Sequence, residues 1–250
     1  MTPPVRVLLV GAAGRMGQSI VSAAKSIKEV EISAQADQGH CLADFMCSCD
    51  VVIDFSHPVA AERVCAGCGT HRIPLVIGTT GHSPEQMRFI TDAAQSIPVL
   101  QAANFSVGVN TLFWLTRKAA ALLGEDFDLE IIETHHRHKK DAPSGTAKRL
   151  AEVLGEARGL GRQQNVVHGR EGASGERPRN EIGIHAIRAG DVVGDHTVIF
   201  ASPGERLELT HKASSRETFA VGALRAARWI IDKPADLYSM EDVLGLQRSS

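Results

Sequence analysis

Five short apolar runs alternate with segments of helical periodicity over the first hundred residues. The runs cover 5–10, 30–36, 50–56, 74–78 and 98–103. Between them, apolar residues recur at helical spacing (Met16, Ile20 and Ala23), and the segment 83–86 (SPEQ) has the N-cap, first-position proline and glutamine of a capping box. Strands that alternate with helices form parallel sheets with right-handed crossovers. The sequence therefore predicts a doubly wound α/β domain.

The pattern changes after Asn104. A helix is expected over 107–123, a strand over 127–134 and a second helix over 145–158, before a glycine- and arginine-rich stretch, 159–180, that predicts a long loop. Three strand-like runs follow at 181–188, 195–201 and 206–211. Consecutive strands without helices between them indicate a mixed or antiparallel sheet, so a second, α+β region is expected before the final helical pattern.

A glycine-rich turn, VGAAGRMG, joins the first strand to the first helix and places glycine at positions 11, 14 and 17. Glycine lets the backbone approach a pyrophosphate closely, and the helix N-terminus offers free N–H groups and partial positive charge. Asp37 ends the second strand 20 residues beyond Gly17, where a carboxylate can accept hydrogen bonds from ribose hydroxyls. The alternative is a tight turn without a ligand, but strand, turn, helix and acid together predict a dinucleotide site.

The residue after Asp37 bears on which dinucleotide is used. Gln38 stands there instead of an arginine, so a 2′-phosphate would meet the carboxylate without an adjacent cation. NADH is therefore the expected cofactor, and NADPH is possible because Arg15 could supply a positive charge. GTTG (78–81) and AANFS (102–106) end the fourth and fifth strands and are expected to line the nicotinamide half of the cleft.

The segment ETHHRHKKDAPSGTA (133–147) concentrates three histidines and two lysines in one turn. Pro143 disfavours helical geometry at Ala142, so a helix can begin near Ser144 with N–H groups available to a carboxylate. Three interpretations compete. The turn is a solvated basic loop, a metal site that uses His135 and His138, or an anion-binding acid/base site that faces the cofactor.

Composition narrows the class of protein. Lys and Arg number 27 and Asp and Glu 29, which gives no global basic field for nucleic acid, and no apolar run suggests a membrane span. A strand-like run already begins at Val5, so no signal peptide and a cytoplasmic location are expected. All five cysteines lie at or before Cys68. Cys65 and Cys68 are interpreted as buried thiols on a helix, with a zinc site as the alternative.

The motif at 133–147 closely resembles the signature of the 4-hydroxy-tetrahydrodipicolinate reductase (dihydrodipicolinate reductase) family. The resemblance extends in family order to VGAAGRMG, VVIDFS, VIGTTG, AANFSVGVN, RAGDVVGDHTVIF and ERLELTHKASSRETFAVGAL. It implies a cyclic dicarboxylate substrate and a homotetramer that assembles through the sheet of the second domain. The expected division is a dinucleotide-binding domain, 1–106 plus 215–250, and a substrate-binding and oligomerisation domain, 107–214.

The resemblance and the local chemistry together predict the site residues. His135 and Lys139 are expected to be the catalytic proton donors. The substrate-binding residues are expected to be His136, Ser144, Gly145 and Thr146. The cofactor-binding residues are expected to be Gly11, Ala12, Ala13, Gly14, Arg15, Met16, Asp37, Gly78, Thr79, Thr80, Ala102, Ala103, Asn104 and Phe105. No metal is expected.

The chain departs from the family pattern in one place, because only 12 residues separate Asp37 from Asp50 where many members have a longer segment. This difference lies near the adenosine end and bears on the choice of cofactor. Two other functions remain as alternatives. A semialdehyde dehydrogenase on the same scaffold would need a cysteine nucleophile in the second region, and a dinucleotide-sensing protein would not need His135 and Lys139.

Overall fold

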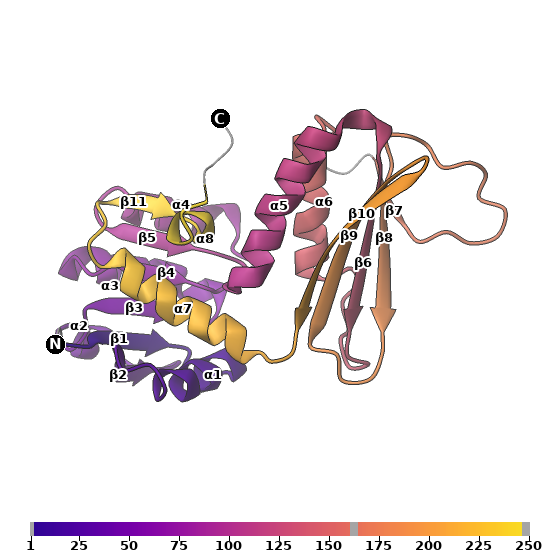
Figure 1. Cartoon of the computed structure of the whole chain (residues 1–250). Helices are drawn as coiled ribbons and strands as arrows, with labels where there is room; N and C mark the ends of the chain where they lie inside the picture. The colour runs from indigo at the N-terminus through magenta and orange to yellow at the C-terminus, as the bar shows by residue number, and fades with distance from the viewer. Residues whose placement is uncertain (1–2, 161–164, 247–250) are drawn as a thin grey trace. The chain divides into compact units, whose positions relative to one another are not determined.

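The computed structural model describes residues 3–160 and 165–246. The chain forms two compact units, one of Met1–Val107 with Glu217–Ser250 and the other of Gly108–Arg216 (Figure 1). The first is an α/β unit built on a parallel sheet, and the second is an α+β unit built on a mixed sheet. The predicted fold class is confirmed.

The sheet of the first unit has six parallel strands in the order β11-β5-β4-β3-β1-β2. The strands are β1 (Val5–Val10), β2 (Val30–Ala36), β3 (Val51–Asp54), β4 (Leu75–Ile77), β5 (Pro98–Gln101) and β11 (Asp236–Tyr238). The five strands predicted near the N-terminus are confirmed. The sixth, β11, was not predicted, because its sequence, DLY, is neither an apolar run like the LVI of β4 nor long enough to show an alternation.

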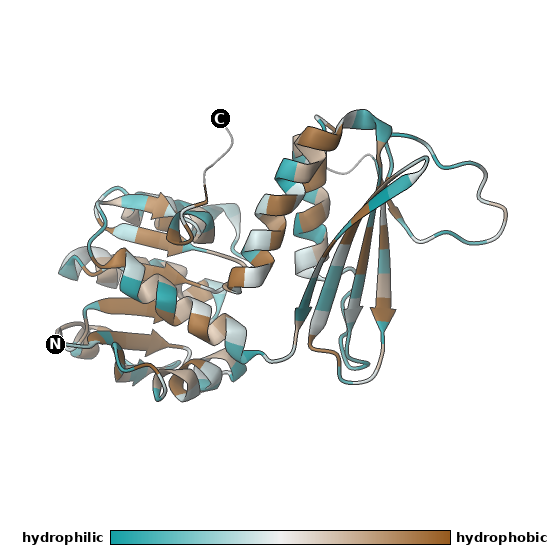
Figure 2. Ribbon diagram, viewed as in Figure 1, coloured by the Kyte–Doolittle hydropathy of each residue, from teal (hydrophilic) through white to brown (hydrophobic). Residues whose placement is uncertain are grey.

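Helices cover both faces of this sheet. One face carries α1 (Arg15–Ala24), α7 (Glu217–Ile230) and α8 (Met240–Val243), and the other carries α2 (Ala43–Met46), η1 (Pro58–Ala60), α3 (Ala61–His71) and α4 (Pro84–Ala93). Val7 and Leu9 of β1 belong to the first hydrophobic cluster and Leu8 and Val10 to the second. Burial on both faces explains why these strands read as continuous apolar runs, and they are predominantly brown in Figure 2.

The second unit has a five-stranded sheet in the order β10-β9-β6-β8-β7. Its elements are α5 (Val107–Leu123), η2 (Gly124–Asp126), β6 (Asp128–His135), α6 (Gly145–Ala157), β7 (Val166–His168), β8 (Ile182–Arg188), β9 (Gly194–Ser202) and β10 (Glu205–Ala213). Strand β6 pairs parallel with β8 and antiparallel with β9. The helices α5 and α6 bury one face of the sheet through Ile131, Leu150, Val198 and Phe200.

The predicted loop at 159–180 is partly wrong. Strand β7 lies within it and pairs in parallel with β8, so the stretch contributes an edge strand to the sheet. Three residues flanked by glycines and arginines gave no strand signal, and residues 161–164 of that stretch lie outside the described residues. No helix in the described part of the chain is both long and apolar enough to cross a bilayer.

Cys65 and Cys68 lie on α3 and are buried against the sheet, as predicted. Burial raises the pKa of the Cys65 thiol to about 12, so this group is a neutral thiol at pH 7. Among the residues that the structure describes, no three or more His, Cys, Asp or Glu side chains are grouped to hold a metal ion. These cysteines therefore act as small core residues.

Candidate active site

The turn between β1 and α1 is too tight for side chains at two of its glycines. Gly11 has a φ of 84°, and a Cβ there would lie 2.5 Å from the carbonyl oxygen of Phe55. A Cβ on Gly17 would lie 2.3 Å from the carbonyl oxygen of Gly11. Helix α1 begins after Gly14 with no side-chain cap and no acidic residue in its first turn. Its N-terminal N–H groups are therefore available to an anion.

Asp37 lies beside this turn, at the end of β2. Its carboxylate accepts hydrogen bonds from the N–H of Ala13, at 3.1 and 3.2 Å. The short segment that follows forms a turn and the helix α2, and the N–H of Asp37 donates to Nδ1 of His40 at 3.0 Å. Gln38 and Arg15 are both exposed. The structure thus brings together the glycine turn, Arg15 and Asp37, which the sequence predicted as parts of one site.

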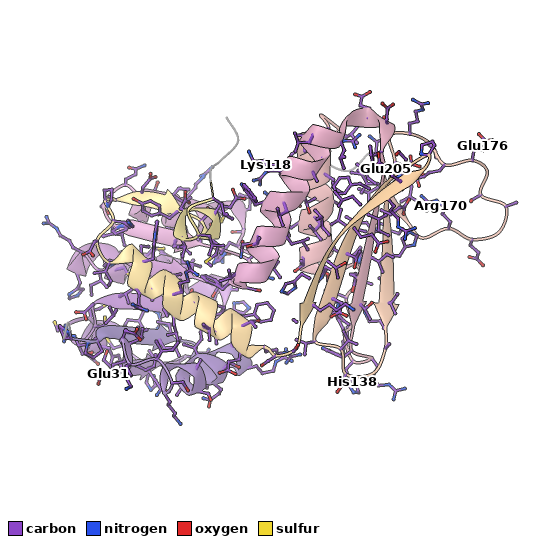
Figure 3. All side chains as sticks on the ribbon, viewed as in Figure 1. Glu31, Lys118, His138, Arg170, Glu176 and Glu205 are labelled. Atoms are coloured by element: carbon purple, nitrogen blue, oxygen red, sulfur yellow. The ribbon has the colours of Figure 1, made fainter. Side chains whose placement is uncertain are left out.

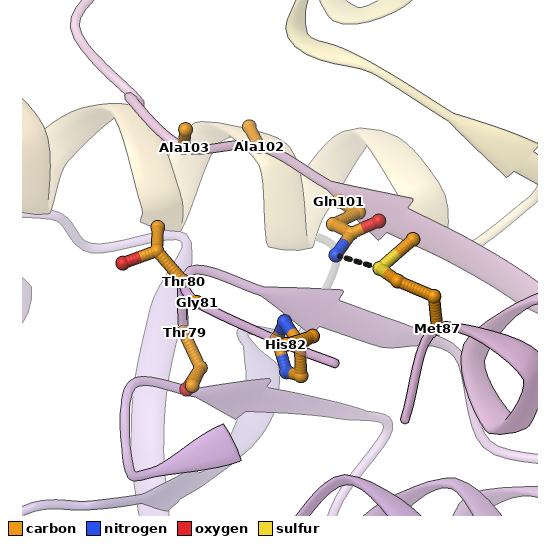
Figure 4. A pocket seen from close by; sticks show the side chains of 8 residues that line it. All are labelled: Thr79, Thr80, Gly81, His82, Met87, Gln101, Ala102 and Ala103. Atoms are coloured by element: carbon orange, nitrogen blue, oxygen red, sulfur yellow. Dashed lines mark hydrogen bonds between the residues drawn. The ribbon is translucent and has the colours of Figure 1, made fainter. Parts of the chain in front are cut away.

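A pocket of about 370 Å³ lies at the carboxyl ends of β4 and β5 (Figure 4). It is lined by Thr79, Thr80, Gly81, His82, Met87, Gln101, Ala102 and Ala103. Four of these were predicted as cofactor-binding residues, and Gln101 and Met87 join the two sides through an Nε2–Sδ hydrogen bond of 3.4 Å. His82 was missed, although it directly follows the GTTG segment. The ends of adjacent parallel strands therefore form the expected concave edge.

Other predicted cofactor residues pack in the interior, behind the ends of these strands. A Cβ on Gly78 would lie 2.1 Å from Cζ of Phe55, so glycine is needed for the ring to fit. Phe55 packs on Phe105 with ring centroids 5.4 Å apart, and Phe105 is buried. The hydroxyl of Thr79 donates to the buried carboxylate of Asp54 at 3.1 Å. The hydroxyl of Thr79 is thus held by a buried carboxylate beside the pocket, and the ring of Phe105 lies in the interior.

In the second unit, β6 ends at His135 and α6 begins at Gly145. Ser144 is the N-cap of α6, and its hydroxyl accepts a hydrogen bond from the N–H of Ala147 at 3.1 Å. Gly145 is exposed at the first helical position, where no preceding helical carbonyl pairs with its N–H. The predicted helix start is confirmed. Thr146 follows on the same first turn.

The carboxylate of Glu133 is the buried anion beneath this turn. It accepts hydrogen bonds from Nδ1 of His135 at 2.5 Å, from both Nη atoms of Arg188 at 2.8 Å and from the N–H of Ser144 at 3.0 Å. Burial by itself raises the pKa of this carboxyl, but these donors together hold it below its usual value. Glu133 and Arg188 were not predicted as site residues. The adjacency of Glu133 to the histidines in the motif was the available signal.

A second histidine, His196 of β9, lies deeper in the site. Its Nε2 is 2.9 Å from the hydroxyl of Ser144, and its ring lies edge-on to that of His135 with centroids 5.2 Å apart. Burial, followed by the charge of His135, lowers the pKa of His196 to about 4, so the ring is neutral at pH 7. Ser144 is only 2% exposed. Its side chain, predicted to bind substrate, is therefore engaged within the protein by α6 and His196.

The other basic residues of the turn lie either at the surface or beside the site. Lys139 donates to both carboxylate oxygens of Asp141 at 2.9 Å. His136 lies 3.3 Å from an Nη atom of Arg216, a residue that was missed by sequence reasoning. His138 is exposed at the turn that follows β6, where Figure 3 labels it. Burial, followed by the charge of Arg216, lowers the pKa of His136, so its ring is predominantly neutral at pH 7, and Lys139 and Arg216 are the cations of this rim beside the α6 N-terminus.

Comparisons with known proteins agree with this two-unit organisation. The family description "Dihydrodipicolinate reductase, N-terminus" matches residues 5–105, and "Dihydrodipicolinate reductase, C-terminus" matches residues 108–244. A 4-hydroxy-tetrahydrodipicolinate reductase of Akkermansia muciniphila is 55% identical over 244 residues, which cover 98% of this chain and 99% of the relative.

Solved structures show the same fold. A dipicolinate-bound dihydrodipicolinate reductase from Paenisporosarcina sp. TG-14 has a TM-score of 0.78 and 25% identity, over 94% of this chain and 97% of the other. GenD2 from gentamicin A biosynthesis, in complex with NAD, has a TM-score of 0.60 over 98% and 92% of the two chains, and at 11% identity it shows the fold alone. Because both family descriptions and a close full-length relative match, the chain belongs to the dihydrodipicolinate reductase family.

Proposed function

We propose that this chain reduces the dehydrated form of 4-hydroxy-tetrahydrodipicolinate with a nicotinamide coenzyme, giving tetrahydrodipicolinate in the diaminopimelate route to lysine. One observation carries the proposal. The turn between β6 and α6 gathers His135, His136 and Lys139 beside an exposed helix N-terminus. A relative of 55% identity is a 4-hydroxy-tetrahydrodipicolinate reductase. Positive charge and transferable protons in one place suit the reduction of an anionic imine.

The first unit, Met1–Val107 with Glu217–Ser250, is the part that we assign to the coenzyme. The glycine turn fits a pyrophosphate, because a Cβ at Gly11 or Gly17 would fill the space next to the backbone, and the first turn of α1 carries no acid. We assign the adenine ribose to Asp37 and the nicotinamide to the pocket at Thr80 and Ala102. When bound, the coenzyme supplies the hydride.

NADH is the coenzyme that we expect this site to prefer. The Asp37 carboxylate can accept hydrogen bonds from the 2′- and 3′-hydroxyls of the ribose, and it would repel a 2′-phosphate. The neighbouring Gln38 brings no compensating charge. NADPH can still bind, because Arg15 is exposed at the start of α1 and can reach toward a phosphate.

The second unit, Gly108–Arg216, is the part that we assign to the substrate. A cyclic dicarboxylate has two anionic groups, which we assign to the start of α6 at Gly145 and Thr146 and to the guanidinium of Arg216 with His136 beside it. A solved relative is named as dipicolinate-bound, which supports a ligand of this class. Hydride addition to the conjugated imine leaves an electron-rich carbon that must take up a proton. We assign that proton transfer to His135 and Lys139, whose positive charge also stabilises the negative charge that develops.

Steady-state oxidation of NADH, with the unstable substrate generated in situ by the upstream synthase, tests this function. Turnover is expected with NADH and, at lower efficiency, with NADPH. Lys139→Ala should lower kcat at least 100-fold while the Kd for NADH stays within twofold, because Lys139 lies in the substrate unit. The matched control is Lys140→Ala, an exposed neighbour that should leave kcat unchanged. Absence of turnover with both coenzymes would refute the function, and an equal loss of NADH affinity would refute the placement of Lys139.

The assembly and location are further parts of the proposal. The family resemblance implies a homotetramer built on the mixed sheet, whose exposed edge strand β10 is largely teal in Figure 2. Sedimentation equilibrium tests the tetramer, and charge substitutions on β10 should dissociate it. The location that we propose is the cytoplasm, which cell fractionation tests.

A further inference from the structure

Glu133 is a fully buried carboxylate on the strand that ends in His135. The two residues are separated by one position, so both side chains lie on the face of the sheet that α5 and α6 cover. The side chain of Glu133 is 0% exposed and that of His135 is 12% exposed. A buried acid is costly unless its charge is compensated and its oxygens are hydrogen-bonded.

Each carboxylate oxygen of Glu133 accepts two hydrogen bonds. Oε2 accepts from Nδ1 of His135 at 2.5 Å and from Nη1 of Arg188 at 2.8 Å. Oε1 accepts from the N–H of Ser144 at 3.0 Å and from Nη2 of Arg188 at 2.8 Å. The guanidinium of Arg188 also donates to the carbonyl oxygens of Ile187 and Asp141, both at 2.7 Å. The carboxylate is therefore fixed in position and cannot rotate without breaking several hydrogen bonds.

This arrangement determines which nitrogen of His135 carries the proton. An ionised carboxylate can only accept, and the low pKa of Glu133 keeps it ionised, so Nδ1 must be the donor. The other nitrogen, Nε2, has no hydrogen-bond partner within residues 3–160 and 165–246. Next to it is Gly194, where a Cβ would lie only 3.0 Å from Nε2. The neutral ring of His196 packs edge-on against the same imidazole.

We propose that Glu133 is the positioning residue of the acid/base histidine, which it holds with the Nδ1 proton directed inward and Nε2 free to exchange a proton with the substrate. Arg188 supplies the charge that lets Glu133 remain buried as an anion. The hydrogen bond from the N–H of Ser144 also ties this pair to the start of α6, so one carboxylate aligns the proton donor and the anion-binding helix end. The inference rests on the proposed function for the role of Nε2, but not for the protonation of Nδ1.

Nuclear magnetic resonance tests the protonation directly. In protein labelled with ¹⁵N-histidine at alkaline pH, where imidazole is neutral, His135 should show a protonated Nδ1 and an unprotonated Nε2. Its signals are assigned by their absence in His135→Gln. In Glu133→Gln the ring should shift toward the Nε2-protonated form that free histidine prefers. An Nε2-protonated His135 in the unsubstituted protein would overturn the proposal, and this result does not depend on whether Glu133→Gln folds.

Kinetics test the consequence. Glu133→Gln should lower kcat on the order of 10–100-fold, with KM for the substrate and Kd for NADH within about twofold. The matched control is Glu130→Gln on the same strand, β6. It removes a carboxylate that also binds two arginines but does not contact His135. That variant should keep both kcat and the His135 spectrum.

The outcomes separate the two levels of inference. A kcat for Glu133→Gln equal to that of Glu130→Gln, in folded protein, would overturn the positioning role. Absence of turnover in the unsubstituted protein would overturn the proposed function, while the spectrum still decides whether Glu133 fixes the ring.

Discussion

Replacing His196 should make the free energy of unfolding of the second unit less sensitive to acid between pH 7 and 5. His196 is buried, and burial followed by the charge of His135 lowers its pKa to about 4. The unfolded chain exposes an ordinary imidazole with a pKa of about 6.5. The unfolded state therefore binds more protons than the folded state in this range. Since the folded pKa is depressed, the stabilisation is present above pH 6.5 and is lost as the pH falls toward 4.

The size of the effect follows from the two pKa values. A single group with pKa values of about 6.5 unfolded and about 4 folded reduces the free energy of unfolding by about 2 kcal/mol between pH 7 and pH 5, and by about 3 kcal/mol at pH 4. The measurement belongs at pH 5 and above, because carboxyl groups begin to titrate below that. In His196→Gln the side-chain amide can still form a hydrogen bond with the Ser144 hydroxyl, and no proton is taken up.

Urea unfolding at fixed protein concentration provides the measurement. The chain has two tryptophans, Trp114 in α5 and Trp229 in α7, so a Trp229→Phe background makes fluorescence report on the second unit. The difference in unfolding free energy between the background protein and His196→Gln should shrink by about 2 kcal/mol from pH 7 to pH 5. His138→Gln, at an exposed position, is the control. An unchanged pH dependence in His196→Gln would show that His196 is not held neutral.

Three further outcomes are expected from the structure. Gly17→Ala should weaken NADH binding at least tenfold in a fluorescence titration, because the Cβ would lie 2.3 Å from a carbonyl oxygen, whereas Gly69→Ala on α3, with nothing within 4 Å of its Cβ, should bind normally. Glu130 has a pKa of about 2, despite its burial, because arginines bind its carboxylate. This lowered pKa stabilises the fold by about 1–2 kcal/mol, a figure reduced for partial exposure, above pH 4.5, and the stabilisation should be lost as the pH falls toward 2. Urea unfolding at each pH measures this loss, which Glu130→Gln should not show. Gln38→Arg should raise the ratio of kcat/KM for NADPH to that for NADH, and an unchanged ratio would contradict the assignment of the ribose to Asp37.

The fold was predictable where the pattern was long and local. Five parallel strands and the helix Val107–Leu123 follow from apolar periodicity, and the capping box at Ser83 is present with both of its hydrogen bonds. The strands β7 and β11 were missed because each has three residues that include a polar one, whereas the equally short β4 is entirely apolar. Such strands form because an existing sheet edge offers hydrogen-bond partners, which is information that their own residues do not carry.

The site was predictable only in its outer part. Charge clustering and a proline before a helix start pointed to the cationic turn, because both signals lie in one short segment. The contacts of Arg188 with Glu133 and of His196 with Ser144 join residues 55 and 52 positions apart. These partners are set by which strands neighbour β6 in the mixed sheet. A single sequence does not give that order, so neither Arg188 nor His196 was predicted as a site residue, although both lie in the family-like segment RAGDVVGDHTVIF.

Strand alternation explains how one short motif supplies two layers of the site. Glu133 and His135 occupy alternate positions of β6 and so share its inner face, where Ser144 joins them from the start of α6. Beyond His135 the strand ends, and the alternation no longer directs side chains inward. His136 and Lys139 lie in the turn, and Gly145 is exposed at the helix start. Positions within the strand therefore build the buried support, and positions past its end present charge and N–H groups to an anion. In Glu133→Gln the amide oxygen can still accept the hydrogen bond from the N–H of Ser144, so this variant should change the histidine while the helix start and the substrate affinity are kept. Replacing a residue of the turn should change the contact with the substrate itself.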